Sequence, residues 1–249
     1  MKLTGKTILL TGGTSGVGLA LLHQLHALGN RMIVVGRNPG RITELQQAYP
    51  DVTFLRYNLS SQEHMADLLL TLQRDFCGNG PDSISVLINN AGVQHNYTLG
   101  DDPEGQSRIV SEIQTNFTSV IQLCDALLPT LKEQPEATII NVTSGLGISP
   151  KRSAPVYCAT KAGLQVFSKA LRYQLEGSSV RVVDVVLPLV DTPMTAGRGS
   201  GKIAPEQVAD ELIRGVERGQ SVINVGKVKL LRLIHRLVPS LADRMLKNG

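Results

Sequence analysis

A tyrosine and a lysine lie four residues apart in the segment Tyr157-Cys158-Ala159-Thr160-Lys161. Within a helix this spacing places both side chains on one face. A free tyrosine has a pKa of about 10, which is too high for efficient proton transfer at neutral pH. A neighbouring ammonium favours the phenolate, and we expect it to lower the pKa of Tyr157 by roughly 1–3 pH units. The pair would then exchange a proton with a carbonyl or alcohol oxygen.

Two polar residues earlier in the chain could complete this pair. Ser144 follows a predicted strand, where its hydroxyl could hydrogen-bond a substrate oxygen as negative charge develops. Asn116 falls in the middle of a predicted helix, although asparagine is a poor helix former. A Tyr-x-x-x-Lys spacing alone is unspecific and usually belongs to a surface helix. Together with Ser144 and Asn116 it forms a candidate catalytic set.

A glycine-rich turn, Thr11-Gly12-Gly13-Thr14-Ser15-Gly16-Val17-Gly18, joins a predicted strand to a predicted helix. Glycines at such a turn permit a tight bend and let backbone N–H groups approach a pyrophosphate. A plain turn is the alternative, but it does not need so many glycines. The turn therefore predicts dinucleotide contacts from Gly12, Thr14, Ser15, Gly16, Val17 and Gly18.

Short β-branched runs alternate with helical patterns along the whole chain. The predicted strands cover residues 7–10, 31–35, 52–56, 85–89, 137–142, 180–187 and 221–225, and most are continuously apolar at their centres. The predicted helices between them cover residues 17–28, 41–48, 62–76, 107–128, 156–176 and 205–218. This order predicts a single α/β domain with a doubly wound parallel sheet of seven strands and helices on both faces.

The composition excludes several classes of protein. The chain has 249 residues, of which 42% are hydrophobic and 18% charged, so it is not a disordered protein. It contains no apolar stretch of the ~20 residues that a membrane-spanning helix needs, and no signal-peptide pattern. Cys77, Cys124 and Cys158 form no C-x-x-C pair, so we expect reduced thiols, no metal site and a cytoplasmic location.

Positive charge is concentrated at the end of the chain. Residues 226–249 contain six Lys and Arg and one acidic residue, a local charge of +5, while the whole chain carries +4. The remainder therefore sums to −1, and aromatic residues make up only 4% of the chain, which argues against nucleic-acid binding.

Several segments match one family. The spacing Gly12-x-x-x-Gly16-x-Gly18 resembles the T-G-x-x-x-G-x-G fingerprint of the short-chain dehydrogenase/reductase family, and Asn89-Asn90-Ala91-Gly92 resembles its N-N-A-G motif. The resemblance implies a Rossmann-fold enzyme that transfers hydride between a nicotinamide cofactor and a carbonyl or alcohol. The family's four catalytic positions correspond to Asn116, Ser144, Tyr157 and Lys161.

The resemblance also implies a role for each member of this set. Tyr157 would transfer the proton, while Lys161 would lower its pKa and bind the cofactor ribose. Ser144 would stabilise the oxyanion, and Asn116 would lie at a helix kink that maintains a proton relay. A non-catalytic protein that senses NADP(H) on the same fold is the alternative.

The second predicted strand ends at Val35-Gly36-Arg37-Asn38 without an acidic residue. An acid there would bind the ribose of NAD, whereas Arg37 suits the 2′-phosphate, so NADP(H) is favoured and NAD(H) remains open. A surface arginine without this role is the alternative. The family pattern implies further cofactor contacts from Asn58, Leu59, Asn90, Ala91, Gly92, Tyr157, Lys161, Pro188, Val190 and Thr192. Asn58 stands where the family usually has Asp, and Leu189 where it usually has Gly.

The last 24 residues predict a basic amphipathic tail, residues 226–249, attached to the main domain of residues 1–225. We expect its apolar stripe to pack on the same domain or on a second subunit. Covering the substrate cleft or touching an anionic membrane are the alternatives, and a lipid-like carbonyl or alcohol substrate would suit both. Residues 195–204 predict a substrate lid. Because relatives pair their long helices, we expect a homodimer or homotetramer.

Overall fold

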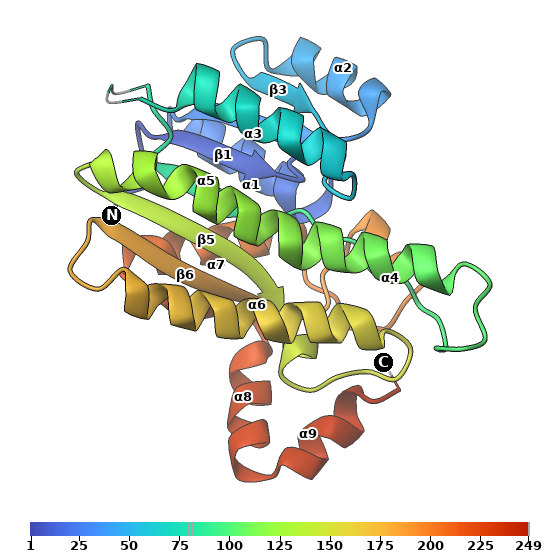
Figure 1. Ribbon diagram of the computed structural model, residues 1–249. Helices are drawn as coiled ribbons and strands as arrows, with labels where there is room; N and C mark the ends of the chain where they lie inside the picture. Colours follow the sequence, from blue (N-terminus) through green and yellow to red (C-terminus); the bar gives the residue numbers. More distant parts are fainter. Residues whose placement is uncertain (79, 81, 249) are drawn as a thin grey trace.

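The computed structural model describes residues 1–78, 80 and 82–248. Within these residues, seven parallel strands form one sheet in the order β3-β2-β1-β4-β5-β6-β7 (Figure 1). The strands are β1 Thr7–Thr11, β2 Arg31–Gly36, β3 Thr53–Arg56, β4 Val86–Asn89, β5 Ala137–Ser144, β6 Val180–Leu187 and β7 Val222–Asn224. The chain is therefore a single-domain, doubly wound α/β protein, as the alternation of elements predicts.

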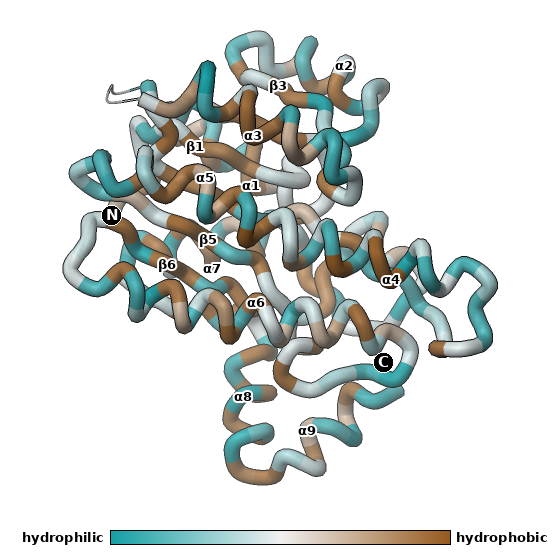
Figure 2. The backbone as a smooth tube through the Cα atoms, in the orientation of Figure 1, coloured by the Kyte–Doolittle hydropathy of each residue, from teal (hydrophilic) through white to brown (hydrophobic). Residues whose placement is uncertain are grey.

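Helices cover both faces of the sheet because successive strand residues point to opposite sides. Ile8 and Leu10 pack in one core cluster, with α1 Gly16–Ala27 and α7 Pro205–Glu217. Leu9 packs in the other, with α3 Gln62–Phe76, α5 Ser119–Glu133 and α6 Pro155–Gln174. The remaining helix of the sheet region, α2 Pro39–Ala48, lies beside β3 (Figure 1). The hydropathy of the chain follows this layering, with hydrophobic segments along the inner strands (Figure 2).

A buried polar chain joins the centre of the sheet to α6. Asn89 on β4 donates a hydrogen bond to the side-chain oxygen of Asn141 on β5 (2.9 Å), and Asn141 donates to Ser168 on α6 (2.9 Å). All three side chains are buried. Buried amides need such partners, and the first Asn of the N-N-A-G segment therefore holds strands together instead of facing the cavity.

The long helix predicted over residues 107–128 is interrupted and ends later than expected. It consists of α4 Gly105–Ile113, a π-helical turn Gln114–Thr118 and α5, which continues to Glu133. The predicted end before Pro129 is therefore wrong. Proline removes one helical hydrogen bond, but Leu127 and Leu131 on either side of it are both fully buried, and this packing favours continuation of the helix.

The basic tail forms two helices, α8 Val228–Leu237 and α9 Pro239–Leu246, beside the carboxyl edge of the sheet (Figure 1). It packs on the domain through Val228, Leu231 and Ala242. Asp243 accepts a hydrogen bond from the Ser149 hydroxyl (2.6 Å), which fixes α9 to the loop before α6. The last residue of the predicted tail, Gly249, lies outside the described residues. No helix in the described part of the chain is long and apolar enough to cross a membrane.

Candidate active site

A cavity of about 740 Å³ opens at the carboxyl edge of the sheet. The strand order reverses between β1 and β4, and such a reversal creates a crevice for ligands in open α/β sheets. The predicted site residues that line this cavity are Gly12, Thr14, Ser15, Gly16, Val17, Gly18, Arg37, Asn58, Leu59, Asn90, Ala91, Gly92, Ser144, Tyr157, Lys161, Pro188, Val190 and Thr192. Asn116 is not at the cavity surface; it is completely buried behind it.

The glycine turn forms a narrow cradle at the start of α1. A Cβ on Gly18 would lie 2.1 Å from the carbonyl oxygen of Gly12, and a Cβ on Gly12 would lie 2.8 Å from the Cα of Ala91. Gly12 and Gly16 also have positive φ angles. No side chain caps the N-terminus of α1, and its first turn contains no acidic residue. The uncapped N–H groups and the absence of side chains at these positions fit a dinucleotide pyrophosphate.

Two arginines follow β2 close to the glycine turn. Arg37 follows β2 and lines the cavity. Arg41, in the first turn of α2, donates a hydrogen bond from Nε to the carbonyl oxygen of Thr14 in the glycine turn (3.2 Å). Sequence reasoning missed Arg41, because its approach to Thr14 depends on how α2 packs. The signal in the sequence that could have found Arg41 is its position four residues after Arg37.

The side-chain oxygen of Asn58 is already engaged. It accepts hydrogen bonds from the backbone N–H (3.2 Å) and the hydroxyl (2.9 Å) of Ser60. An amide oxygen accepts about two hydrogen bonds, so the Asn58 oxygen has no acceptor site left for an adenine amino group. The contact that Asn58 can still offer to an adenine is its amide N–H.

The catalytic candidates Ser144, Tyr157 and Lys161 meet at the same cavity from two elements. Ser144 is the last residue of β5, and Tyr157 and Lys161 lie on one face of α6. The Ser144 oxygen accepts a hydrogen bond from the backbone N–H of Leu146 (3.1 Å). All three side chains are at most 9% exposed, so the reacting groups are largely shielded from water.

The pKa of Tyr157 differs from the sequence-based expectation. Burial raises it to about 12, and a hydrogen bond to Ser144 acts in the opposite direction. The Lys161 ammonium lies 5.8 Å from the centre of the tyrosine ring and donates to the carbonyl oxygen of Val142 (2.9 Å). The predicted lowering by Lys161 is not seen in this arrangement, because burial dominates the shift and Lys161 is not among the groups that oppose it.

Burial also changes the lysine itself. It lowers the pKa of Lys161 to about 8, while the negative charge of Asp184 acts in the opposite direction. A Cβ on Gly92 would lie 3.6 Å from the Lys161 nitrogen, so a glycine at this position leaves room beside the ammonium. Lys161 therefore has free space on its cavity side, where a ribose hydroxyl could accept a hydrogen bond.

Asn116 lies within the π-helical turn between α4 and α5. Its side-chain oxygen accepts a hydrogen bond from the backbone N–H of Val93 (2.8 Å), and its nitrogen donates to the Val93 carbonyl (2.8 Å). Such turns interrupt the regular helical bonding and occur frequently at functional sites. The structure thus shows a local irregularity at the position where the family resemblance implies a kink, and the asparagine side chain holds the loop after β4.

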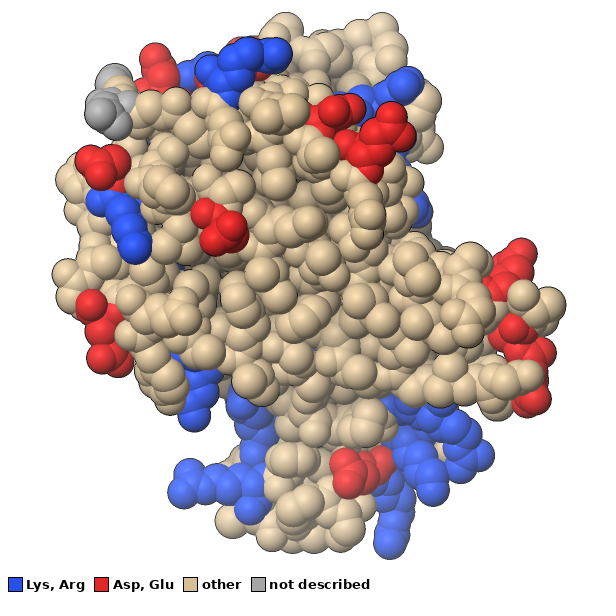
Figure 3. Space-filling model, in the orientation of Figure 1, with Lys and Arg blue, Asp and Glu red and all other residues tan. Residues whose placement is uncertain are grey.

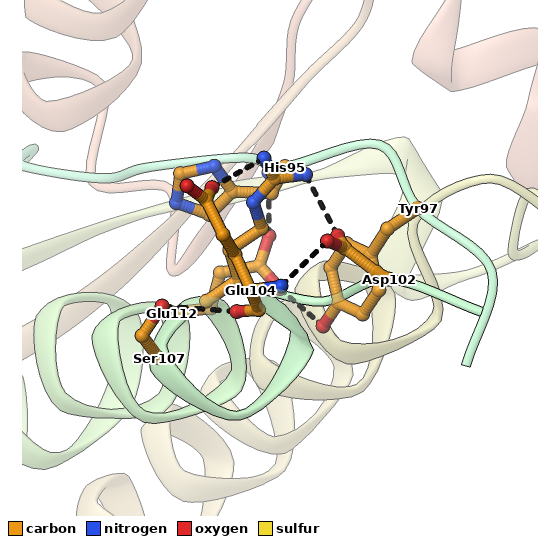
Figure 4. A network of polar contacts seen from close by, with 7 residues as sticks. His95, Tyr97, Asp102, Glu104, Ser107 and Glu112 are labelled. Atoms are coloured by element: carbon orange, nitrogen blue, oxygen red, sulfur yellow. Dashed lines mark hydrogen bonds and ion pairs between the residues drawn. The ribbon is translucent and has the colours of Figure 1, made fainter. Parts of the chain in front are cut away.

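A second polar network fixes the rest of that loop (Figure 4). The completely buried carboxylate of Glu112 accepts hydrogen bonds from the backbone N–H of His95 (2.7 Å) and from the hydroxyl of Tyr97 (3.1 Å). Burial, followed by the charge of Glu112, raises the pKa of Tyr97 to about 12. Glu112 therefore supports the cavity wall from behind, a role that the sequence pattern did not indicate.

The predicted lid, residues 195–204, borders the cavity and is held at its base. Ile203 donates its N–H to Leu189 (3.2 Å) and accepts one from Asp191 (2.9 Å). Lys202 donates to the carbonyl of Thr195 (2.8 Å). Leu189, which stands where the family usually has glycine, also lines the cavity. No group of three or more His, Cys, Asp or Glu that could hold a metal occurs in the described ranges.

Comparison with known proteins identifies the family. The sequence pattern of the family described as short chain dehydrogenase matches residues 6–202, more than half of the chain. The chain belongs to the short-chain dehydrogenase/reductase family. It is 34% identical over 238 residues to the uncharacterized oxidoreductase DltE of Bacillus subtilis, covering 93% of this chain and 92% of the relative. The ketoacyl reductase HetN of a Nostoc species is 28% identical over 262 residues, covering 98% and 88%. This protein is thus an oxidoreductase.

Solved structures of the family share the fold of this short-chain dehydrogenase. A short-chain dehydrogenase from Burkholderia cenocepacia, solved with NADP, aligns over 100% of both chains with a TM-score of 0.84 and 23% identity. Another from Sphingobium yanoikuyae, solved with NADPH, aligns over 96% of this chain and 94% of the other, with a TM-score of 0.81 and 24% identity.

We predict that Gly18→Ala prevents dinucleotide binding, because the new methyl group would overlap the Gly12 carbonyl. A cofactor at 100 times its dissociation constant stabilises a protein by ~2.7 kcal/mol, so the thermal shift with excess NADPH reports binding. The wild-type shift should be absent in the variant. Gly40→Ala is the matched control, since its new methyl group would meet no atom closer than 3.6 Å. A full shift in Gly18→Ala would contradict the assignment of the cradle.

Proposed function

We propose that the protein is an NADPH-preferring reductase that converts a carbonyl group to an alcohol. The observation that carries this proposal is the convergence of Ser144, Tyr157 and Lys161 on the cavity that also contains the glycine cradle. A bound cofactor and a substrate carbonyl would share this enclosed space. NADPH would supply the hydride to the carbonyl carbon.

Each side chain then has a distinct task. Tyr157, with its pKa raised to about 12, is protonated at neutral pH, which is the form that can donate a proton to the carbonyl oxygen. Ser144 would hydrogen-bond the same oxygen as negative charge develops. Lys161 would hold a ribose hydroxyl through its ammonium group. The buried Asn116 positions the loop beside Lys161.

We predict that Tyr157→Phe lowers the rate of carbonyl reduction by roughly 10²–10⁴, the usual contribution of a positioned proton donor. The thermal shift with NADPH should persist, because the phenol hydroxyl transfers a proton and is not the main anchor of the cofactor. Tyr173→Phe is the control, since Tyr173 is exposed on the same helix. The alternative, a non-catalytic NADP(H) sensor, would show cofactor binding without turnover of any carbonyl compound by the wild-type protein.

The proposed preference for NADPH is supported by Arg37 and Arg41, the two arginines beside the glycine turn. We predict that Arg37→Ala weakens NADPH binding by about 10–100-fold, since charge-assisted hydrogen bonds contribute ~1.5–3 kcal/mol. NADH binding should hardly change, because NADH lacks the 2′-phosphate. Titration of both cofactors measures the difference, with the exposed Arg218→Ala as control. Equal losses for NADH and NADPH would contradict the phosphate contact, and NADH preference in the wild-type protein would overturn the assignment.

We also propose that the protein forms a homodimer or homotetramer. Val110 on α4 and Val166 and Tyr173 on α6 are 60–70% exposed. Burying such apolar side chains between subunits would stabilise the assembly, and light scattering in solution tests it. A cytoplasmic location agrees with three free cysteines, since thiols stay reduced there.

We propose that the tail forms a second surface, which contacts an anionic membrane and lipid-like substrates. Leu233 and Leu237 of α8 are more than half exposed, while Lys and Arg side chains gather around α8 and α9 (Figure 3). Helices that combine an apolar face with cationic side chains bind such membranes.

We predict that the protein sediments with vesicles rich in phosphatidylglycerol but not with pure phosphatidylcholine vesicles. The double variant Leu233→Glu, Leu237→Glu should remain in the supernatant, because it places two negative charges on the apolar face. Leu70→Glu is the control, since this residue is equally exposed on α3. If the wild-type protein ignores both vesicles, the membrane proposal is wrong.

A further inference from the structure

Lys151 and Arg198 are two of the cations that line the cavity, and neither has a partner of opposite charge among the described residues. Lys151 lies in the loop before α6 and is only 8% exposed. Arg198 lies in the segment after Thr195, and its Nη1 is buried without a hydrogen-bond partner. Within the described part of the chain, neither side chain forms a salt bridge or donates a hydrogen bond.

These two cations are close enough to affect each other. Burial lowers the pKa of Lys151, and the charge of Arg198 lowers it further. The acids on neighbouring segments are otherwise engaged, since Asp191 pairs with Lys202 and Asp243 accepts a hydrogen bond from Ser149. Like charges that are buried or partly buried without a counter-charge are unfavourable, and an anionic ligand between Lys151 and Arg198 would remove this cost.

Lys151 is held next to the proposed catalytic tyrosine. The backbone N–H of Lys151 donates to the Cys158 sulfur (3.5 Å), and Cys158 directly follows Tyr157. Arg198 comes from a different part of the lining, the segment that follows β6. A third wall is apolar and comes from the tail, through Leu231 of α8 and Leu246 of α9. The substrate part of the cavity thus combines a cationic pair with an apolar surface.

We propose that the cavity selects amphiphilic anions, in which a carboxylate or phosphate ester bridges Lys151 and Arg198 and an apolar chain lies against the tail. The inference rests on the proposed reductase function, because the reacting carbonyl of such a molecule would have to reach Tyr157 and Ser144. Guanidinium and ammonium groups are the usual partners of both anions. Lys151 and Arg198 are therefore specificity-determining residues that bind the substrate away from the reacting atoms.

A binding experiment without turnover tests this pair. Calorimetric titration of the NADP⁺-saturated protein with octanoate, octyl phosphate and octanol compares two anions with a neutral molecule of equal chain length. We expect at least one anion to bind about 10-fold or more tightly than octanol. Lys151→Met and Arg198→Met should each remove this preference while leaving octanol binding unchanged. Arg152→Met is the control, since Arg152 is the exposed neighbour of Lys151 and does not line the cavity.

Three results would overturn the inference. These are equal binding of octanol and both anions, unchanged anion binding in both variants, or weaker NADP⁺ binding in the variants, which would assign the cations to the cofactor. Arg198 lies in a partly exposed loop, so Arg198→Met tests the proposal even if Lys151→Met fails to fold.

Reduction assays separate this inference from the proposed function. The variants should lower kcat/KM about 10-fold or more for a keto acid and leave its methyl ester unaffected. If acid and ester are reduced equally by the wild-type protein, the reductase function stands and the anion selectivity is wrong. If anions bind selectively but neither compound is reduced at any pH, the selectivity stands and the reductase function is wrong.

Discussion

The close approach of backbone segments at the glycine turn is the constraint on which the rest of the structure depends. Gly18 lies so near the Gly12 carbonyl that a single added carbon would be 2.1 Å from it. Asn90 strengthens the same region by donating hydrogen bonds to the carbonyls of Thr11 and Gly12 (3.1 and 3.2 Å). The N-terminus of α1 is thereby held at the carboxyl edge of the sheet, and its N–H groups face the cavity.

The parallel sheet places the candidate catalytic side chains at the same edge as the glycine turn. Because all strands are parallel, their carboxyl ends meet at one edge, and Ser144 at the end of β5 faces the same cavity as the glycine turn. The buried chain from Asn89 through Asn141 to Ser168 connects β4, β5 and α6. Helix α6 carries Tyr157 and Lys161, so their distance from the cradle depends on these interior hydrogen bonds.

Burial governs the chemistry of the site more than the proximity of charges does. It raises the pKa of Tyr157 to about 12 and lowers the pKa of Lys161 to about 8. Both shifts favour the neutral form of the side chain, as expected where charged forms lose their hydration. The same effect acts on Lys151 in the substrate part of the cavity. The loss of hydration thus favours the protonated phenol that the proposed reduction requires, whereas the charged form of Lys151 would be stabilised by an anion beside it.

The sequence by itself determined the order of strands and helices, the glycine turn and the residue types of the proposed catalytic set. These features are local: hydrophobic periodicity follows from the geometry of each element, and the spacing of Tyr157 and Lys161 follows from one helical turn. Tertiary packing, in contrast, decided where α5 ends, because burial of Leu131 outweighs the loss of the helical hydrogen bond at Pro129.

Only the tertiary structure decided how distant segments meet. It brought Arg41 to the glycine turn, Glu112 to the loop after β4, and the tail to the wall of the cavity. It also buried the Tyr157 side chain, and this burial raises the pKa of the phenol to about 12. Each of these outcomes depends on contacts between residues far apart in the chain and on how much water their packing excludes. Neither the contacts nor the exclusion of water can be predicted from the spacing of residues within one segment.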